Sequence, residues 1–192
     1  MRIILGSESK GRQKVLREMG FNFDVMSADI DEKAIRHDNP VEFTLALARA
    51  KAQALIAVII EPALLITSDQ IKIYGGKIRE KPVDKIQADR FLKSYHSEHP
   101  IKTITSVVVT NTRLGIQAEG TDTAKIWFYK ICGQVVDEYI KSGDAFLYAG
   151  AFNHEHSLLS PYVAAIDGER ESILGLPRQL TVELMERVQK QP

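Results

Sequence analysis

The stretch Ala63–Pro82, ALLITSDQIKIYGGKIREKP, carries most of the information about the fold. Residues 63–68 form a compact apolar run, which is typical of an interior strand of a sheet. Asp69 follows at the carboxyl end of this predicted strand. The paired glycines Gly75-Gly76 supply the positive φ angles of a tight turn, so residues 71–79 are predicted to form a β-hairpin. The stretch therefore predicts a buried strand, a carboxylate at its end and a hairpin after it.

Strands and helices alternate on both sides of this stretch. Asn39, Pro40 and Glu42 suit the N-cap, first and third positions of a helix that continues to about residue 58. Further strands are predicted at residues 2–5, 21–26, 102–109 and 117–129, and further helices at 10–19, 85–95, 134–142 and from 177 onward. This alternation predicts an α/β fold, with helices on the faces of a mixed sheet.

Length and composition limit the class of protein. A chain of 192 residues with 44% hydrophobic residues favours a single domain, residues 1–192, which can have two lobes about one cleft, over two independent folds. The 25 basic and 25 acidic residues cancel, which argues against nucleic acid as a partner, because binding to a phosphate backbone needs an excess of clustered cations. The balanced charge is still compatible with a small anionic ligand, since a few converging cations are enough to bind one.

The expected compartment is the cytoplasm. Cys132 is the single cysteine, so no intrachain disulfide forms and a reducing compartment is favoured. The apolar run at the N-terminus is too short for a signal peptide, and no segment reaches the roughly 20 apolar residues of a membrane span. We therefore expect neither a membrane partner nor secretion.

The loop after the first strand is a candidate anion site. Residues 6–9, GSES, stand between a strand and a helix, where free backbone N–H groups and the helix dipole favour phosphate. Ser7 and Ser9 add hydroxyl groups, and Arg12 adds a cation in the first helical turn. The alternative is that Ser9 only caps the helix and Arg12 is solvated. A Walker P-loop is absent from the sequence.

Charged residues elsewhere extend this candidate site. Lys51 lies on a helical stripe among alanines, where it either reaches outward to solvent or faces an anion. Asp69 ends a strand at the edge where α/β sheets bind ligands, although an Asp there can also simply form a turn. Lys77, Arg79 and Lys81 alternate along one strand face, which is more often a solvated charge row than a binding surface.

Two other clusters allow a metal. The acidic residues Asp29, Asp31 and Glu32 carry hard oxygen ligands for a divalent cation, and His154 and His156 resemble part of a zinc site. Acidic loops are usually only solvated, and no third zinc ligand has recognisable spacing. Together, the cations Arg12, Lys51 and Lys81 and the carboxylates Glu32 and Asp69 describe a polyphosphate site.

Several short blocks, in the expected order, resemble the Maf family of nucleotide pyrophosphatases. They span residues 3–188 and comprise Ser7–Arg12 (S-x-S-P-x-R-R in the family), Ile30–Glu32 (V-D-E), Ala50–Ala52 (K-A), Ser68–Gln70 (D-T or D-Q), Glu80–Pro82 (G-K-P), Gly150–Phe152 and Leu174–Pro177. The resemblance implies an elongated, strongly curved mixed sheet flanked by helices around a central cleft, similar to inosine triphosphate pyrophosphatases. It also implies a homodimer.

The resemblance further implies the reaction and its residues. A nucleoside triphosphate would be hydrolysed between its α- and β-phosphates, with Mg²⁺ or Mn²⁺ held by Glu32 and Asp69. The expected catalytic residues are Glu32, Lys51, Asp69 and Lys81, and the expected substrate-binding residues are Ser7, Ser9, Lys10, Arg12, Gln70 and Glu155. This set predicts a hydrolase that clears unwanted nucleotides from the cellular pool.

Some positions refine or qualify the resemblance. Asp69-Gln70 and Glu155 look most like the family branch that hydrolyses 7-methyl-GTP. Gln13 replaces the family's second Arg, and the charge of Lys10 can substitute for it. This replacement supports an alternative, a nucleotide-binding regulator of growth or division with little turnover. A third alternative is a different phosphate-ester hydrolase or a kinase on an α/β scaffold.

Overall fold

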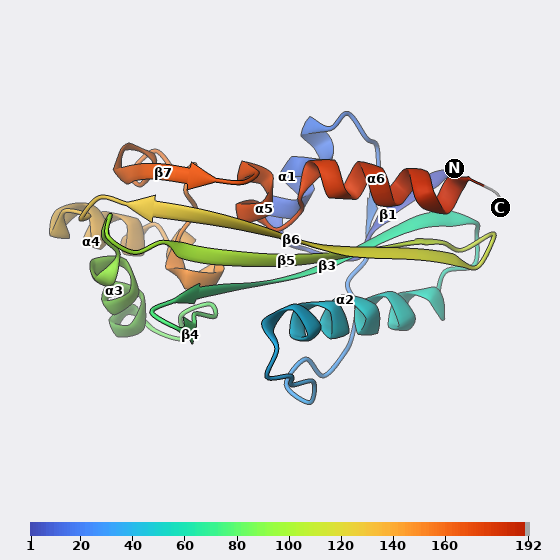
Figure 1. The fold of residues 1–192 in the computed structure, drawn as a ribbon, viewed down its shortest axis with the longest axis horizontal. Helices are drawn as coiled ribbons and strands as arrows, with labels where there is room; N and C mark the ends of the chain where they lie inside the picture. The colour runs from blue at the N-terminus through green and yellow to red at the C-terminus, as the bar shows by residue number, and fades with distance from the viewer. Residues whose placement is uncertain (191–192) are drawn as a thin grey trace. The chain divides into compact units, whose positions relative to one another are not determined.

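The computed structural model describes residues 1–190. In chain order its elements are β1 (Arg2–Leu5), α1 (Lys10–Glu18), β2 (Asp24–Val25), α2 (Pro40–Ile56), β3 (Ala63–Tyr74), β4 (Lys77–Ile78), α3 (Lys85–Ser94), β5 (Ile101–Asn111), β6 (Ile116–Phe128), α4 (Gly133–Lys141), η1 (Asp144–Phe146), η2 (Ala149–Ala151), η3 (Ser160–Tyr162), β7 (Val163–Asp167), α5 (Arg170–Leu174) and α6 (Arg178–Gln189) (Figure 1). Within these residues, seven strands belong to one sheet in the order β2-β1-β3-β5-β6-β7, with β4 beside β3.

The sheet is mixed, as the sequence predicts. β1 pairs in parallel with both β2 and β3, whereas β3–β4 and β6–β7 are antiparallel pairs. The chain divides into two compact units. Unit 1 comprises Met1–Gln70, Ile104–Asp122 and the chain from Leu174 onward, and unit 2 comprises Ile71–Thr103 and Thr123–Ile173. Strands β3, β5 and β6 contribute residues to both units. The mixed sheet with its helices confirms the predicted α/β fold class.

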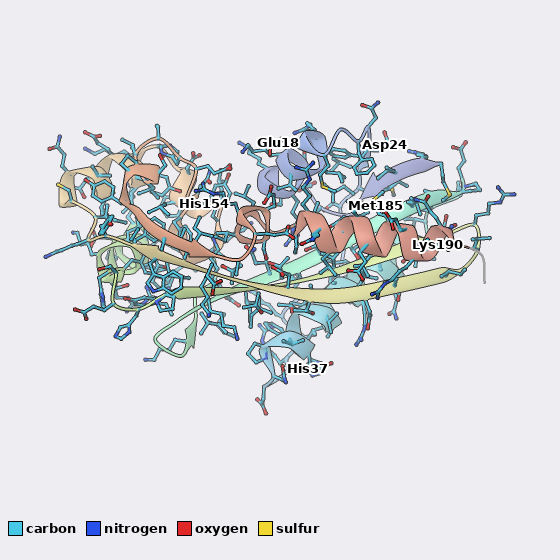
Figure 2. All side chains as sticks on the ribbon, turned by 45° about the horizontal axis from the view of Figure 1, so that its top comes forward. Glu18, Asp24, His37, His154, Met185 and Lys190 are labelled. Carbon is cyan, nitrogen blue, oxygen red and sulfur yellow. The ribbon has the colours of Figure 1, made fainter. Side chains whose placement is uncertain are left out.

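Unit 1 has helices on both faces of its strands (Figure 1). One core contains buried residues of α1, α6 and alternate strand positions: Leu5, Val15, Leu16, Leu64, Ile66, Val107, Val109, Leu184, Met185 and Val188. Figure 2 labels Met185 on α6. The other core joins α2 to the intervening strand positions: Ile4, Ala48, Ala52, Leu55, Ala63, Leu65 and Val108. Because strand side chains alternate between faces, the continuous apolar run of β3 supplies both cores.

The cap of α2 forms as predicted. The Asn39 side-chain oxygen accepts hydrogen bonds from the backbone N–H groups of Val41, at 2.8 Å, and Glu42, at 3.4 Å. Pro40 occupies the first helical position, where its missing N–H costs nothing. This cap fixes the start of the helix that carries Lys51 toward β3.

Unit 2 has one core, built on α3, α4, β5, β6 and η2. Its largest buried side chains include aromatic residues that pack edge to face, such as Tyr95 with Phe152 at 5.7 Å between ring centroids. The guanidinium of Arg79 lies over the rings of Tyr74, Phe91 and Tyr95 and donates to the Ser94 hydroxyl at 2.8 Å. The interpretation of Arg79 as one of a row of solvated charges is therefore wrong, because its cation is bound by aromatic faces.

Several elements differ from the sequence-based prediction. β3 continues through Tyr74, so Asp69 lies within a 12-residue strand and not at its end. The predicted strand at residues 21–26 is reduced to Asp24–Val25. β7 and α5 were not predicted, because residues 163–174 contain too short a pattern to distinguish strand from helix. No helix within residues 1–190 is long and apolar enough to cross a membrane.

Unit 2 also buries a lysine. Lys72 on β3 is 1% exposed, and its ammonium lies 3.7 Å from the centroid of the Phe152 ring and 3.4 Å from the Phe152 carbonyl oxygen. Burial lowers the pKa of Lys72 from 10.5 to about 7. The native state therefore binds fewer protons than the unfolded chain between these two values, so this group makes stability rise with pH across that window.

We expect Lys72→Met to stabilise the protein at pH 6 by about 1–3 kcal/mol, since the cost of burying the charge exceeds the lost cation–π contact. The gain should shrink as pH rises from about 7 toward 10, because the free-energy cost of releasing the lysine's proton on folding falls over that range. Urea unfolding at pH 6, 8 and 10 measures this difference. A variant less stable than the parent at pH 6, or a difference that does not change with pH, would contradict the account.

Candidate functional site

The loop after β1 and the first turn of α1 hold Arg12 in a fixed position. Its Nε donates to the Gly175 carbonyl oxygen at 3.0 Å, and Nη1 donates to the Ser7 hydroxyl oxygen, also at 3.0 Å. The backbone N–H of Ser9 donates to the same Ser7 oxygen at 3.2 Å. Burial lowers the pKa of Arg12, and the negative charges of Asp69 and Glu32 oppose this shift. Arg12 therefore remains a preorganised cation close to two carboxylates.

Lys51 joins those two carboxylates. Its Nζ lies 2.6 Å from Asp69 Oδ1 and 2.8 Å from Glu32 Oε1. The Lys51 and Asp69 side chains are 11% and 12% exposed, whereas the Glu32 side chain is 55% exposed. Because Lys51 projects from α2 toward β3, its stem is buried and its charge faces anions. Of the two alternatives open from the sequence, the structure supports the one in which Lys51 faces an anion.

Sequence reasoning missed two supporting groups, Ser68 and the carbonyl of Gly175. Ser68 is buried on β3 and donates to the Gly175 oxygen at 2.9 Å, so this oxygen accepts from Ser68 and Arg12 together. Gly175 has φ +102°, a conformation that residues with a Cβ rarely adopt. The block Leu174–Pro177 was noted in the sequence but was given no role. The contact joins residues 107 positions apart, which local patterns do not reveal.

Gly11 allows close packing between α1 and the backbone at Leu174. It is buried on α1, and a Cβ built there would lie 2.7 Å from the carbonyl oxygen of Leu174. Because that neighbour is backbone and cannot rotate away, the structure has no room for a larger side chain at this position. Gly11 therefore lets α1 approach Leu174 closely, one residue before the carbonyl that anchors Arg12.

Three other candidate residues of unit 1 are neighbours of the site residues in the sequence, but none of them takes part in the ion pairs of Lys51. Gln70 Nε2 donates to the Thr105 hydroxyl at 3.0 Å. Lys10 is exposed at the first position of α1. Ser9 is the N-cap residue of α1, and it makes no side-chain capping hydrogen bond. The roles of these three residues in binding substrate stay predictions.

Two candidates belong to unit 2. Lys81 is exposed between β4 and α3, and Glu155 is exposed in the segment after η2. The backbone N–H of Glu155 donates to Asn153 Oδ1 at 3.1 Å, which shapes a local turn. Their part in binding substrate stays a prediction. The ion-paired group that the structure describes consists of unit 1 residues, Glu32, Lys51 and Asp69.

The alternative metal clusters are not supported. A metal site needs several His, Cys, Asp or Glu side chains whose ligand atoms lie close together. Within residues 1–190, His154, His156 and Asp29 belong to no such group of three or more. His154 is buried in unit 2 and is labelled in Figure 2, and His156 Nε2 lies 3.5 Å from the carboxylate of Asp144. Cys132 is the N-cap residue of α4, which is an ordinary structural role.

The residues around Lys51 fit a hard divalent cation in chemical type. Glu32 and Asp69 provide carboxylate oxygens, which Mg²⁺ and Mn²⁺ prefer, and both are drawn to one point by Lys51 Nζ. Glu32 is exposed enough to reorient toward an ion, while Asp69 is fixed on the strand. A cation bound by these two groups together with phosphate oxygens matches the usual magnesium arrangement, in which protein carboxylates supply only some of the ligands.

Two curated relatives are similar over nearly their whole length. A 7-methyl-GTP pyrophosphatase of Dictyostelium discoideum is 44% identical, with 97% of this chain and 96% of the relative covered. A dTTP/UTP pyrophosphatase of Vibrio cholerae is 30% identical, with 97% of each chain covered. A solved nucleoside-triphosphatase (dITP/XTP pyrophosphatase) of Mycobacterium abscessus is 10% identical, with a TM-score of 0.39 over 98% of this chain and 96% of that chain.

A family model decides the relationship that the sequence blocks suggested. The model described as Maf-like protein matches residues 2–188, which include the Arg12 loop, Lys51, Asp69 and Gly175. The extent of this match agrees with the near-complete coverage of the curated relatives. The chain belongs to the Maf-like protein family.

Proposed function

We propose that this protein is a nucleoside triphosphate pyrophosphatase, which hydrolyses the bond between the α- and β-phosphates and releases a nucleoside monophosphate and pyrophosphate. The observation that carries the proposal is the group of ion pairs that Lys51 makes with Glu32 and Asp69, two carboxylates whose charges also act on Arg12. The names of the curated relatives support the same reaction class.

The cations of this group are suited to hold a polyphosphate. Arg12 has a planar guanidinium whose position is set by Ser7 and Gly175, so little entropy is lost when it binds phosphate oxygens. Lys51 supplies a second charge from a buried position, where electrostatic interactions are stronger than in water. We assign Ser9 and Lys10 to the same task as further donors.

Asp69 is the group that we assign to activate water. It accepts a proton as the water oxygen bonds to the α-phosphorus, the bond from that phosphorus to the bridging oxygen breaks, and pyrophosphate leaves. Glu32 and Asp69 would hold Mg²⁺ or Mn²⁺, which would supply positive charge to neutralise the departing pyrophosphate. Lys51 keeps the two carboxylates oriented and balances their charge before substrate binds.

We infer that 7-methyl-GTP is the first substrate to test. The relative named for that substrate is 44% identical, against 30% for the Vibrio cholerae dTTP/UTP enzyme. The Gln70 side chain carries an amide that suits hydrogen bonding to a guanine edge, and we assign it to base recognition. The role in the cell would be to remove modified or surplus nucleotides.

The test is pyrophosphate release, with Mg²⁺ or Mn²⁺, from a panel of 7-methyl-GTP, UTP, dTTP, CTP and ITP. The proposal expects monophosphate and pyrophosphate from one or a few of these, with 7-methyl-GTP among them. Folded protein that binds nucleotide but releases no pyrophosphate from any of them would contradict the proposal and favour a nucleotide-binding regulator.

Arg12 provides a prediction about substrate binding. Arg12→Lys keeps one charge but loses the simultaneous hydrogen bonds to Gly175 and Ser7, so the cation becomes mobile. We expect KM for the triphosphate to rise about tenfold or more, with a smaller loss in kcat. Steady-state kinetics measure both constants.

Arg17→Lys is the matched control, since Arg17 lies on the exposed surface of the same helix and contacts Gln13. It should leave both constants unchanged. An unchanged KM in Arg12→Lys would show that Arg12 does not bind the phosphates.

A further inference from the structure

Three metal-ligating side chains lie together in unit 2, on the segment between α3 and β5. The ligand atoms of His96, Glu98 and His99 all lie within 4.8 Å of one another. His96 Nδ1 is 3.9 Å from a carboxylate oxygen of Glu98, and the centroids of the two imidazole rings are 5.3 Å apart. None of these residues belongs to the candidate site built around Lys51.

The chemistry of this cluster differs from that of Glu32 and Asp69. Two imidazoles and one carboxylate form a ligand set that suits Zn²⁺ and its neighbours Co²⁺, Ni²⁺ and Cu²⁺, whereas Mg²⁺ prefers oxygen ligands alone. Bonds of roughly 2.0–2.1 Å in a tetrahedral site place ligand atoms about 3.4 Å apart. Rotations of exposed side chains are enough to close the remaining gap, and the fourth position stays available for water.

The backbone that carries the cluster is anchored at both ends. Before it, Tyr95 is 1% exposed and donates its hydroxyl hydrogen to the Gly150 carbonyl oxygen at 2.8 Å. After it, Pro100 restricts the chain and Ile101 enters the core as the first residue of β5. Anchored ends reduce the entropy that is lost when a metal orders the side chains between them.

His96 is also oriented by its own contact. Its ring packs edge to face on Tyr74, with 6.2 Å between centroids, and the Tyr74 hydroxyl donates to the Ser94 carbonyl oxygen at 2.7 Å. One of the three ligands is therefore partly positioned before a metal arrives. Glu98 and His99 are exposed and free to complete the site.

We propose that His96, Glu98 and His99 bind one divalent transition-metal ion, with Zn²⁺ as the probe, at a site separate from the one that processes the nucleotide. The bound ion crosslinks residues 96–99 next to the core of unit 2. It therefore stabilises the folded protein, since a ligand that prefers the native state raises the unfolding temperature, and more so at higher ligand concentration.

The test is a Zn²⁺ titration of the full-length protein against a chromophoric chelator, followed by thermal unfolding with and without Zn²⁺. His99→Ala is compared with His37→Ala, which removes an exposed histidine of unit 1 that Figure 2 labels. We expect the parent and His37→Ala to bind one more equivalent of Zn²⁺ than His99→Ala. Their unfolding temperature should also rise more with Zn²⁺, and a chelator should reverse that rise.

Other groups that bind Zn²⁺, such as Cys132 or Asp69, are present in all three proteins and cancel in the comparison. Equal stoichiometry and affinity in His99→Ala and the parent would overturn the proposal, as would a parent that binds no Zn²⁺. Pyrophosphate release with Mg²⁺ is measured on the same samples, and we expect His99→Ala to retain it. The metal site and the proposed function can therefore fail separately.

Discussion

Replacing Asp69 by Asn is expected to lower pyrophosphate release by at least about 10³-fold, because the amide cannot accept a proton from the attacking water. The protein should stay folded. Asn has nearly the same volume, its carbonyl oxygen can still accept from Lys51 Nζ, and Glu32 remains 2.8 Å from the same nitrogen. Steady-state release from the best substrate of the panel, together with circular dichroism, measures both effects.

Asp24→Asn is the matched control for this substitution. Asp24 is an exposed carboxylate of unit 1 that pairs with Arg2, and it is labelled in Figure 2. Surface pairs of this kind contribute little to stability, so activity and folding should both be unchanged. Turnover of Asp69→Asn within a few-fold of the parent would remove Asp69 from the role of base.

Removing the charge of Lys51 is expected to have the second-largest effect. Lys51→Met keeps most of the buried stem but leaves Glu32 and Asp69 without their shared cation, so the carboxylates repel each other and the phosphate loses a donor. We expect kcat/KM to fall about 10²- to 10³-fold, similar to the loss of one preorganised electrostatic group. Stability should also fall, by about 3 kcal/mol, since the buried Asp69 loses its closest partner.

Arg49→Met serves as the control on the same helix. Arg49 pairs with Glu119, and its side chain is 42% exposed, so its loss removes a cation of α2 without touching the group around Lys51. We expect nearly full activity from it and only a small change in the unfolding temperature. If Lys51→Met matched this control in kcat/KM, the proposed role of the lysine would be wrong.

Local chemistry made much of the fold predictable. The Asn39 cap, the apolar run at Ala63 and the turn at Gly75-Gly76 each encode their structure within a few residues, and all three occur in the structure. The run at Ala63 and the first strand of the hairpin were predicted as separate strands, because polar residues interrupt the apolar pattern between them, whereas the structure joins them in β3. Those positions, Asp69 and Gln70, are polar because one forms the ion pair with Lys51 and the other contacts Thr105.

The candidate site was only partly predictable. Glu32, Lys51 and Asp69 were selected from charge type and family resemblance, and the structure brings these three together. The Gly175 carbonyl was missed, since a backbone acceptor leaves no signature in side-chain chemistry. Ser68 was missed with it, because its hydroxyl donates to that carbonyl. The aromatic environment of Arg79 was missed for a related reason, because it joins β3 and α3 through contacts that spacing does not encode.

The bond that is cleaved is the central claim, and hydrolysis in ¹⁸O-labelled water tests it most directly. The protein is incubated with Mg²⁺ and its best triphosphate substrate, and the products are analysed by mass spectrometry. Attack of water at the α-phosphorus predicts one ¹⁸O in the nucleoside monophosphate and none in the pyrophosphate. Label in the pyrophosphate, or products that are a diphosphate and inorganic phosphate, would contradict the account.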